Sequence, residues 1–293
     1  MNSQLLKNLS LGMACLFALA TTDAYAQSST AQPPAVGVGP ALPLYPLDCA
    51  VTSQGTAFVV DRNLPGVWKW ENNALSIFVQ GSKRYREPLN AARCLALDHQ
   101  GKLLVGDSST REIYRISDAG QPQPLTDGQI GIPMDIAVKS DGTIYVADLE
   151  LRRLVRIPAG SKTVETVANV NPRGVFVDHS NQVWVVSQGE QQLQIVSDNG
   201  ETEIVVGNRV FEFPHTVVVN QQGEAFVSDG YKKAIWKVVR GGQPEIVVQG
   251  APLENPVGLT LVDDQVIVTD PRAAKVFRLT KENQLEVWFE IKR

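Results

Sequence analysis

The sequence has few of the residues that build specialised scaffolds. Its 293 residues include only three cysteines and three histidines, and basic residues number 27 against 31 acidic ones. Three cysteines are too few for a disulfide-built fold, so a hydrophobic core must hold the chain together. A net charge of −4 argues against a dedicated nucleic-acid-binding protein, which needs a concentrated basic surface. Hydrophobic residues at 43% fit an ordinary soluble globular protein.

The N-terminus has the features of an export signal. A weakly basic start precedes the apolar run Leu9–Ala20, which is too short to span a bilayer. Ala24-Tyr25-Ala26 fits a small-x-small cleavage site, so residues 1–26 are predicted to be a signal peptide cleaved after Ala26. Cys15 raises a lipoprotein alternative, which the residues before it match poorly. We therefore expect a periplasmic or secreted protein with no membrane span, and residues 27–44, rich in Ser, Pro and Gly, as a flexible leader.

The rest of the chain, residues 45–293, repeats one pattern six times. Each copy has a short hydrophobic stretch that ends at an anchor residue, and the anchors lie 46, 41, 39, 42 and 41 residues apart: Asp61, Asp107, Asp148, Ser187, Asp229 and Asp270. A proline or alanine lies fifteen residues before five anchors: Pro46, Ala92, Pro133, Pro172 and Pro214. In the last copy, Pro256 lies fourteen residues before its anchor. Because the copies share nearly the same spacing between these two positions, they form a true repeat.

Each copy divides into four short strands. In the third, the strands are expected at 134–138, 143–148, 153–157 and 163–167, with a tight Asp141-Gly142 turn after the first. Hydrophobic and polar residues alternate with period two, and no stretch has helical period. A repeat of roughly 40–50 residues with four strands is typical of a propeller blade. The sequence predicts an all-β fold, a six-bladed β-propeller with four antiparallel strands per blade.

The repeat resembles a known family. A Pro-x-(Asp/Gly)-Ile-Ala-Val segment, a later Gly-x-Ile-Tyr-Val-x-Asp segment and an Arg/Lys-x-x-Arg pair in the third strand are similar to the NHL repeat, from Pro46 to the C-terminus. The pattern also overlaps the gluconolactonase/senescence-marker-protein group. This resemblance implies a six-bladed propeller. It leaves the chemistry open, because that family includes binding modules, sensor domains, lyases and lactonases.

The propeller geometry points to candidate binding residues. The first strand of each blade lies innermost, so the two residues after each proline position should rim one mouth of the central channel, on the face that we call the top. The rim includes five candidate residues: Asp48, Arg93, Asp135, Arg173 and His215. Two guanidinium groups can clamp a carboxylate or phosphate, and a histidine can move protons. Alternatively, the Asp and Arg side chains neutralise one another and hold the blades in register.

Metal and cofactor chemistry is not expected. The resemblance implies that lactonase relatives hold a divalent cation with Glu, Asn and Asp, often in a Pro-Asn-Gly turn, whereas this chain has Pro172-Arg173-Gly174. Two carboxylates beside two arginines make a poor calcium site. The resemblance to peptide-amidating lyases implies several channel histidines for zinc, but His99 and His179 fall in turns of the opposite face. We therefore expect no cofactor and no metal.

Loops of the top face supply further candidates. Basic residues interleaved with aromatics suit an acidic partner, and the ligand-binding candidates here are Lys83, Arg84, Tyr85, Arg86 and Tyr231. Ordinary solvent-exposed loops would have the same composition.

Other repeated residues are expected to have structural roles. The repeated aspartates are expected to cap loops. The aromatics at one repeat position are expected to pack between blades: Trp68, Tyr114, Trp236 and Phe277. Cys49 and Cys94 lie on neighbouring inner strands, and the sequence leaves open a disulfide or buried thiols.

Three functions fit these features. The first expectation is an exported, monomeric, non-catalytic propeller that binds a protein partner or a small anionic ligand through its top face and channel mouth. The alternative is a lactonase- or lyase-like enzyme acting at the channel, with His215, Asp48 and Asp135 as its catalytic residues. A third is a sensor-type module derived from a larger signalling protein. No nucleic-acid partner is expected.

Overall fold

A computed structural model describes residues 44–291 of the chain. The predicted signal peptide and all of the predicted leader except residue 44 lie outside the described residues, so both stay predictions. The described part contains twenty-four strands and no helix. Accordingly, none of its segments is a helix of the length and hydrophobicity that a membrane crossing requires.

The strands form six antiparallel four-stranded sheets, each from consecutive strands. Blades 1 and 2 contain β1 (Pro46–Val51), β2 (Ala57–Asp61), β3 (Leu64–Glu71), β4 (Ala74–Gln80), β5 (Ala92–Leu97), β6 (Leu103–Asp107), β7 (Glu112–Ile116) and β8 (Pro122–Pro124). Blades 3 and 4 contain β9 (Pro133–Val138), β10 (Ile144–Asp148), β11 (Arg153–Ile157), β12 (Glu165–Ala168), β13 (Pro172–Val177), β14 (Val183–Ser187), β15 (Leu193–Val196) and β16 (Thr202–Val206). Blades 5 and 6 contain β17 (Pro214–Val219), β18 (Glu224–Asp229), β19 (Ala234–Val239), β20 (Glu245–Gln249), β21 (Gly258–Val262), β22 (Gln265–Asp270), β23 (Lys275–Leu279) and β24 (Leu285–Glu290).

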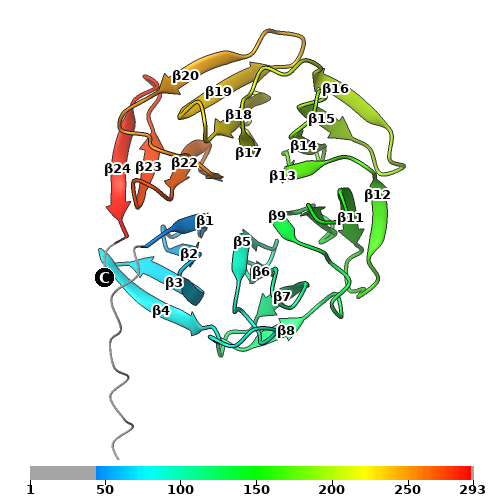
Figure 1. Ribbon diagram of the computed structural model, residues 1–293, viewed down its shortest axis with the longest axis vertical. Helices are drawn as coiled ribbons and strands as arrows, with labels where there is room; N and C mark the ends of the chain where they lie inside the picture. The colour runs from blue at the N-terminus through cyan, green and yellow to red at the C-terminus, as the bar shows by residue number, and fades with distance from the viewer. Residues whose placement is uncertain (1–43, 292–293) are drawn as a thin grey trace, which may run out of the picture. The chain divides into compact units, whose positions relative to one another are not determined.

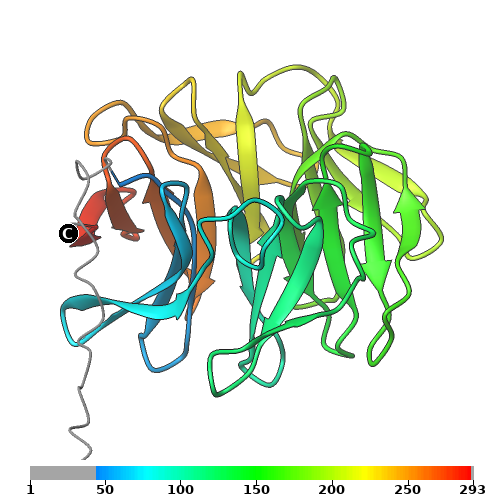
Figure 2. The same ribbon diagram turned by 60° about the horizontal axis from the view of Figure 1, so that its bottom comes forward.

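The six sheets stand around a central axis, which confirms the predicted six-bladed β-propeller (Figure 1). The first strand of each blade is innermost and the fourth is outermost, and the strands run between the two faces of the ring (Figure 2). In the third blade the predicted strands agree with β9–β12 to within two residues. Its first turn is tight because Gly142, at φ +87°, donates its amide to the Lys139 carbonyl over 2.9 Å.

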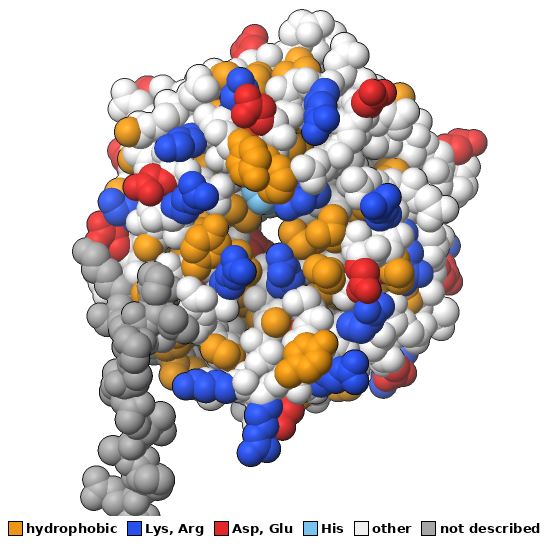
Figure 3. Space-filling view, viewed as in Figure 1, with side chains coloured by type: hydrophobic (Ala, Val, Ile, Leu, Met, Phe, Trp, Pro, Cys, Tyr) orange, Lys and Arg blue, Asp and Glu red, His pale blue; other side chains and the backbone are white. Residues whose placement is uncertain are grey.

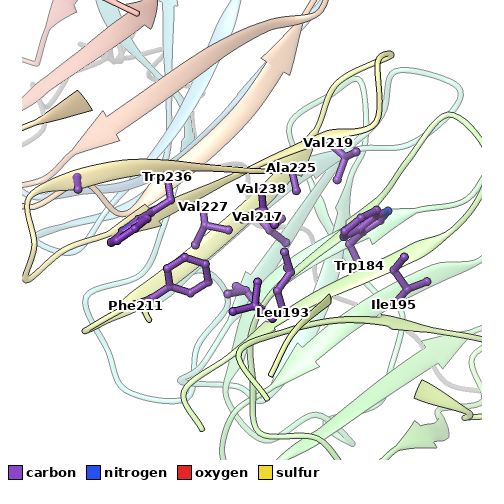
Figure 4. Packing of buried hydrophobic residues seen from close by; sticks show 13 residues of the cluster. Trp184, Leu193, Ile195, Phe211, Val217, Val219, Ala225, Val227, Trp236 and Val238 are labelled. Carbon is purple, nitrogen blue, oxygen red and sulfur yellow. The ribbon is translucent and has the colours of Figure 1, made fainter. Parts of the chain in front are cut away.

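The hydrophobic core is divided among the gaps between adjacent blades. Figure 4 shows one of these clusters, in which Trp184 and Leu193 of blade 4 pack against Val217 and Trp236 of blade 5. A cluster of the same kind joins the last blade to the first and includes Val59 of β2 and Phe289 of β24. The ring is therefore closed by side-chain packing between complete blades.

The predicted packing role of the third-strand aromatics is confirmed. Tyr114, Trp236 and Phe277 are buried in three different clusters between blades. Trp68 is partly buried against the cluster that closes the ring. A large ring at this position fills the wide outer part of the gap between two diverging sheets, where smaller side chains would leave voids.

A disulfide between Cys49 and Cys94 does not form. Both residues are buried free thiols. Cys49 packs in the cluster between the last and first blades, whereas Cys94 packs in the cluster between the second and third blades. The two side chains point away from the gap that their blades share, so their sulfur atoms cannot approach bonding distance.

Buried carboxylates fix the loops of the top face. At the end of the second strand in five blades, an aspartate accepts backbone N–H groups from residues 15 to 17 positions earlier. These residues are Asp61, Asp107, Asp148, Asp229 and Asp270. Each bond ties the loop that enters the innermost strand to the end of the second strand. The expected loop-capping role of the repeated aspartates is confirmed.

We expect Asp107→Ala to destabilise the protein strongly. The fully buried carboxylate accepts hydrogen bonds from the amides of Ala91 and Ser109 over 3.0 and 2.9 Å, and from the Thr110 hydroxyl over 2.9 Å. Leaving these donors unsatisfied should lower the free energy of unfolding by about 3 kcal/mol, measured by urea denaturation. Asp118→Ala removes only an exposed ion pair with Lys102, so it should cost less than about 1 kcal/mol. Equal losses in the two variants would contradict the role assigned to the buried carboxylate.

Candidate functional site

A β-bulge at the start of the inner strand aims side chains at the channel mouth. In five blades the pairing of the first and second strands shifts register immediately after the first residue of the inner strand. A bulge leaves one residue outside the hydrogen-bond pattern and redirects its side chain. The residues within these bulges are Leu47, Arg93, Met134, Arg173 and the His215-Thr216 pair.

The sixth blade has no register shift within its paired residues. β21 begins at Gly258, opposite Thr269, so the position that holds the bulge in the other blades precedes this strand. Pro256 lies fourteen residues before Asp270, one fewer than in the other copies, because the turn is shorter: Val262 pairs with Gln265, whereas Val51 pairs with Ala57 in blade 1. Val257, which follows Pro256, lines the same cavity as the bulge residues.

The bulges surround a cavity of about 170 Å³ at the channel mouth. It is lined by Tyr45, Leu47, Asp48, Arg62, Arg93, Met134, Asp135, Arg173, His215, Thr216, Asn255 and Val257. Figure 3 shows the hollow at the centre of this face, with arginine or lysine and hydrophobic side chains around it. All five rim candidates from the sequence are brought together here. Sequence reasoning missed Tyr45, Arg62 and Asn255, although all three lie next to a repeat landmark, either the proline or the anchor aspartate.

Three nitrogen atoms of the mouth residues are buried without a hydrogen-bond partner. They are Nε of Arg93, Nε of Arg173 and Nδ1 of His215. No protein atom within residues 44–291 bonds to these three nitrogens, so all three are free to bond to a partner in the cavity. This pattern is expected where a ligand supplies the missing partners.

The guanidinium groups of the mouth are not neutralised by carboxylates. None of the ion pairs within residues 44–291 joins Arg93 or Arg173 to an acidic side chain. Arg173 instead donates to Gln188 Oε1 over 3.1 Å and lies over the ring of Phe213, 4.4 Å from its centroid. Burial lowers the pKa of both arginines, and each also feels a neighbouring arginine, Arg62 in one case and Arg93 in the other. The mouth is thus prepared for an anion.

The two rim aspartates bond to backbone amides. Asp48 accepts from the amides of Cys49 and Leu95 over 2.9 and 2.8 Å, and its second bond reaches the inner strand of the next blade. Asp135 repeats this arrangement two blades further on, with amide bonds of 2.9 Å from Ile136 and Val175. These carboxylates connect neighbouring blades, but through amides and not through the arginines.

Burial changes the protonation of three mouth residues. It raises the pKa of Asp48 to about 7, against the lowering effect of its two amide bonds. It also raises the pKa of Asp135 well above the usual range, and the negative charge of Asp48 adds to this effect. For His215, burial and then the positive charge of Arg173 lower the pKa to about 3. At neutral pH the imidazole is therefore uncharged.

A divalent cation does not fit this set of donors. The four carboxylate oxygens of Asp48 and Asp135 already accept backbone N–H groups, and Arg93 and Arg173 line the same cavity. Calcium takes six to eight oxygen ligands. Within residues 44–291, no group of three or more His, Cys, Asp or Glu side chains could hold a metal ion. The chemistry of the mouth is therefore derived without a metal.

Aromatic rings extend from the mouth to the surface of blade 5. The ring of Phe213 meets the His215 imidazole edge to face, with 4.9 Å between centroids. Tyr231 stacks on Phe213 with centroids 4.6 Å apart and an interplanar angle of 16°. Tyr231, a candidate from the sequence, thus lies one ring away from the mouth. The other loop candidates, Lys83, Arg84, Tyr85 and Arg86, do not line the mouth cavity.

Solved structures of similar fold include enzymes. A virginiamycin B lyase from Staphylococcus aureus gives a TM-score of 0.66 at 15% identity and covers 85% of each chain. Its catalytically inactive histidine-to-alanine variant with quinupristin gives 0.66 at 15% identity, over 83% of this chain and 84% of that one. A gluconolactonase from Xanthomonas campestris gives 0.65 at 17% identity, over 78% and 84%. A chain of a nidogen/laminin complex gives 0.65 at 16% identity, over 78% and 91%. No protein-family model and no curated protein matches the sequence.

These similarities confirm the resemblance to gluconolactonase-type and NHL-type propellers at the level of the six-bladed fold. They also correct the expected function. The expectation of a non-catalytic binding propeller is overturned, because lyases and gluconolactonases stand among the similar structures. The alternative, an enzyme acting at the central channel, is the interpretation that they favour.

The raised pKa of Asp48 predicts that stability falls as the pH rises. Between the unfolded pKa of 3.8 and the folded value of about 7, the folded protein holds a proton that the unfolded chain releases. The free energy of unfolding should therefore fall by as much as about 3 kcal/mol between pH 5 and pH 8, and less in Asp48→Asn. Urea denaturation across this range measures the difference, with Asp118→Asn as an exposed control. An identical pH dependence in wild type and Asp48→Asn would contradict the prediction.

Proposed function

We propose that the channel mouth is the active site of a lyase-like enzyme that opens a lactone or a related ester by elimination. The observation that carries this proposal is the pairing of a neutral imidazole with two guanidinium groups around one cavity, each with a buried nitrogen that lacks a partner. A base and an anion-binding pair are the two parts that such an elimination needs.

His215 serves as the general base. Its uncharged imidazole takes a proton from the carbon atom next to the one that carries the ester oxygen. The electrons of the broken carbon–hydrogen bond form a carbon–carbon double bond, and the carbon–oxygen bond of the ester breaks. The leaving group departs as a carboxylate with the electron pair of that bond. The proton stays on the imidazole until it returns to solvent, and no water is consumed.

Arg93 and Arg173 bind the carboxylate that develops. Both side chains lie on bulges of alternate blades, and none of the ion pairs within residues 44–291 joins either to an acidic residue. A guanidinium group forms charge-assisted, often bidentate hydrogen bonds to a carboxylate. Because the carboxylate forms only as the carbon–oxygen bond breaks, these bonds strengthen in the transition state and accelerate the reaction.

One of the similar structures supports a catalytic role for a histidine. The lyase variant with a histidine replaced by alanine is described as catalytically inactive. In the present chain His215 is the histidine of the mouth, since His99 and His179 lie in exposed turns after the inner strands β5 and β13. The predicted signal peptide would carry such an enzyme to the periplasm or out of the cell.

Product analysis tests the reaction class. The purified protein is incubated with a panel of lactones and esters that carry an acidic hydrogen beside the ester-bearing carbon, in isotope-labelled water. Elimination gives an alkene and a carboxylate with no oxygen from water, whereas hydrolysis gives a hydroxy acid that contains the label. Labelled product or a complete lack of cleavage would overturn the elimination mechanism.

We expect His215→Ala to lower kcat/KM at least about 100-fold, as is typical for the loss of a general base. His179→Ala changes an exposed histidine outside the mouth and should leave the rate unchanged. Because the pKa of His215 is about 3, the wild-type rate should lack the fall below pH 6.5 that an ordinary histidine base would give. A loss of base function centred near pH 6.5 would contradict the assignment.

We expect Arg173→Ala and Arg93→Ala each to lower kcat/KM about 10- to 100-fold through lost stabilisation of the carboxylate. Arg173→Lys keeps the charge without the planar fork and should recover only part of the rate. Arg209→Ala, which changes an exposed arginine in a loop of the same face, is the matched control. Steady-state kinetics that show equal rates for Arg173→Ala and Arg209→Ala would remove the arginine from the site.

A further inference from the structure

We infer that Tyr231 and Phe213 form a platform that binds an aromatic ring of the substrate, so that the site selects carboxylates and esters with a ring near the reacting group. This inference rests on the proposed function, because it specifies the substrate class of the same site. It goes beyond that function, since neither the base nor the anion-binding pair requires an aromatic substrate.

Ring contacts connect the platform to His215, the proposed base. Phe213 contacts the His215 imidazole with its ring and carries Tyr231 on its outer side, at centroid distances of 4.9 and 4.6 Å. Arg173 also lies over the Phe213 ring, at 4.4 Å from the centroid. A guanidinium group and a stacked phenol cannot share one ring face, so both faces of Phe213 are covered. The aromatic face left for a ligand belongs to Tyr231.

The backbone fixes the platform although Tyr231 is 67% exposed. The Asp229 carboxylate accepts the Phe213 amide over 3.0 Å and the Lys232 amide over 3.2 Å. The amide of Gly230 donates to the Phe213 carbonyl over 3.1 Å. One buried carboxylate therefore positions both loops that carry the rings. An exposed ring held in this way loses little entropy when a second ring stacks on it.

Glycine at position 230 keeps this loop close to the base. A Cβ atom there would lie 3.0 Å from His215 Nε2 and 2.6 Å from Asn255 Oδ1, so a larger residue would displace these side chains or the loop. Among the six blades, the position two residues after the anchor is aromatic in blade 5 alone; the others have Asn63, Ser109, Glu150, Gly189 and Arg272. The blade that supplies the base thus also supplies the ring.

Tyr85 provides a matched contrast on the chain. It is 73% exposed and lies beside the Arg86 guanidinium, which is 5.5 Å from its ring centroid, in a loop that does not line the mouth. Exposure alone therefore does not identify a ligand platform. Tyr231 differs because a continuous set of ring contacts connects it to His215.

Binding of three simple carboxylates tests the inference independently of turnover. The probes are phenylacetate, cyclohexylacetate and acetate, titrated against the whole protein by ligand-observed NMR. Stacking should make phenylacetate bind about fivefold more tightly than cyclohexylacetate, whose ring has similar size but no π-system. Tyr231→Ala should abolish this preference, whereas Tyr231→Phe and Tyr85→Ala should keep it. Thermal melting checks that each variant is folded.

The outcomes separate this inference from the proposed function. Equal affinities for phenylacetate and cyclohexylacetate, a preference that survives in Tyr231→Ala, or a lack of phenylacetate binding at millimolar concentration would each overturn the platform. Arg93→Ala should weaken all three probes alike and leave the ring preference unchanged. If the protein shows no lyase activity but retains a Tyr231-dependent preference, the proposed reaction fails while the platform stands.

Discussion

In five of the six blades, hydrogen bonds between the carboxylate that ends the second strand and the loop that enters the first strand organise the top face. Without them, the backbone amides of this loop would be buried without partners, and the proline that follows would have no fixed position. Since the bulge begins immediately after that proline, the carboxylate also determines where the mouth side chains start. In blade 5, Asp229 does this for His215, and it holds the loop of Tyr231 as well.

The mouth combines a rigid frame with an unbalanced charge distribution. Asp48 and Asp135 connect blades through amide bonds and keep a raised pKa, while the arginines beside them remain without carboxylate partners. A fold that served stability alone would pair these charges. Functional sites commonly carry such unfavourable arrangements, which the surrounding structure has to sustain. Here the packing between blades supplies that support, because every cluster joins two complete sheets.

Much of the fold could be predicted from the sequence, because the repeat determines both the strand positions and the closure of the ring. The five rim residues could be predicted for the same reason. The disulfide could not be excluded, since the spacing leaves two orientations open for Cys49 and Cys94, and only the packing shows that they point apart.

Interactions that depend on loop conformation could not be predicted from the sequence either. The alternating Asp and Arg residues suggested ion pairs, but Asp48 and Asp135 bond to backbone amides instead. The stacking of Phe213 between Arg173 and Tyr231 involves three separate loops or strand ends. The enzymatic interpretation depends on nitrogen atoms of Arg93, Arg173 and His215 that lack a protein partner within the described part of the chain. No pattern in the sequence predicts which buried atoms lack a partner.

The bulge has a consequence for how such a propeller can diversify. A residue outside the hydrogen-bond pattern contributes little to the sheet, so its identity is free to vary while the blade stays intact. Five of the six blades present one such place each, arranged around a common axis. A lineage of these chains could therefore exchange base, anion-binding residue and apolar wall one at a time, and acquire new chemistry without rebuilding its framework.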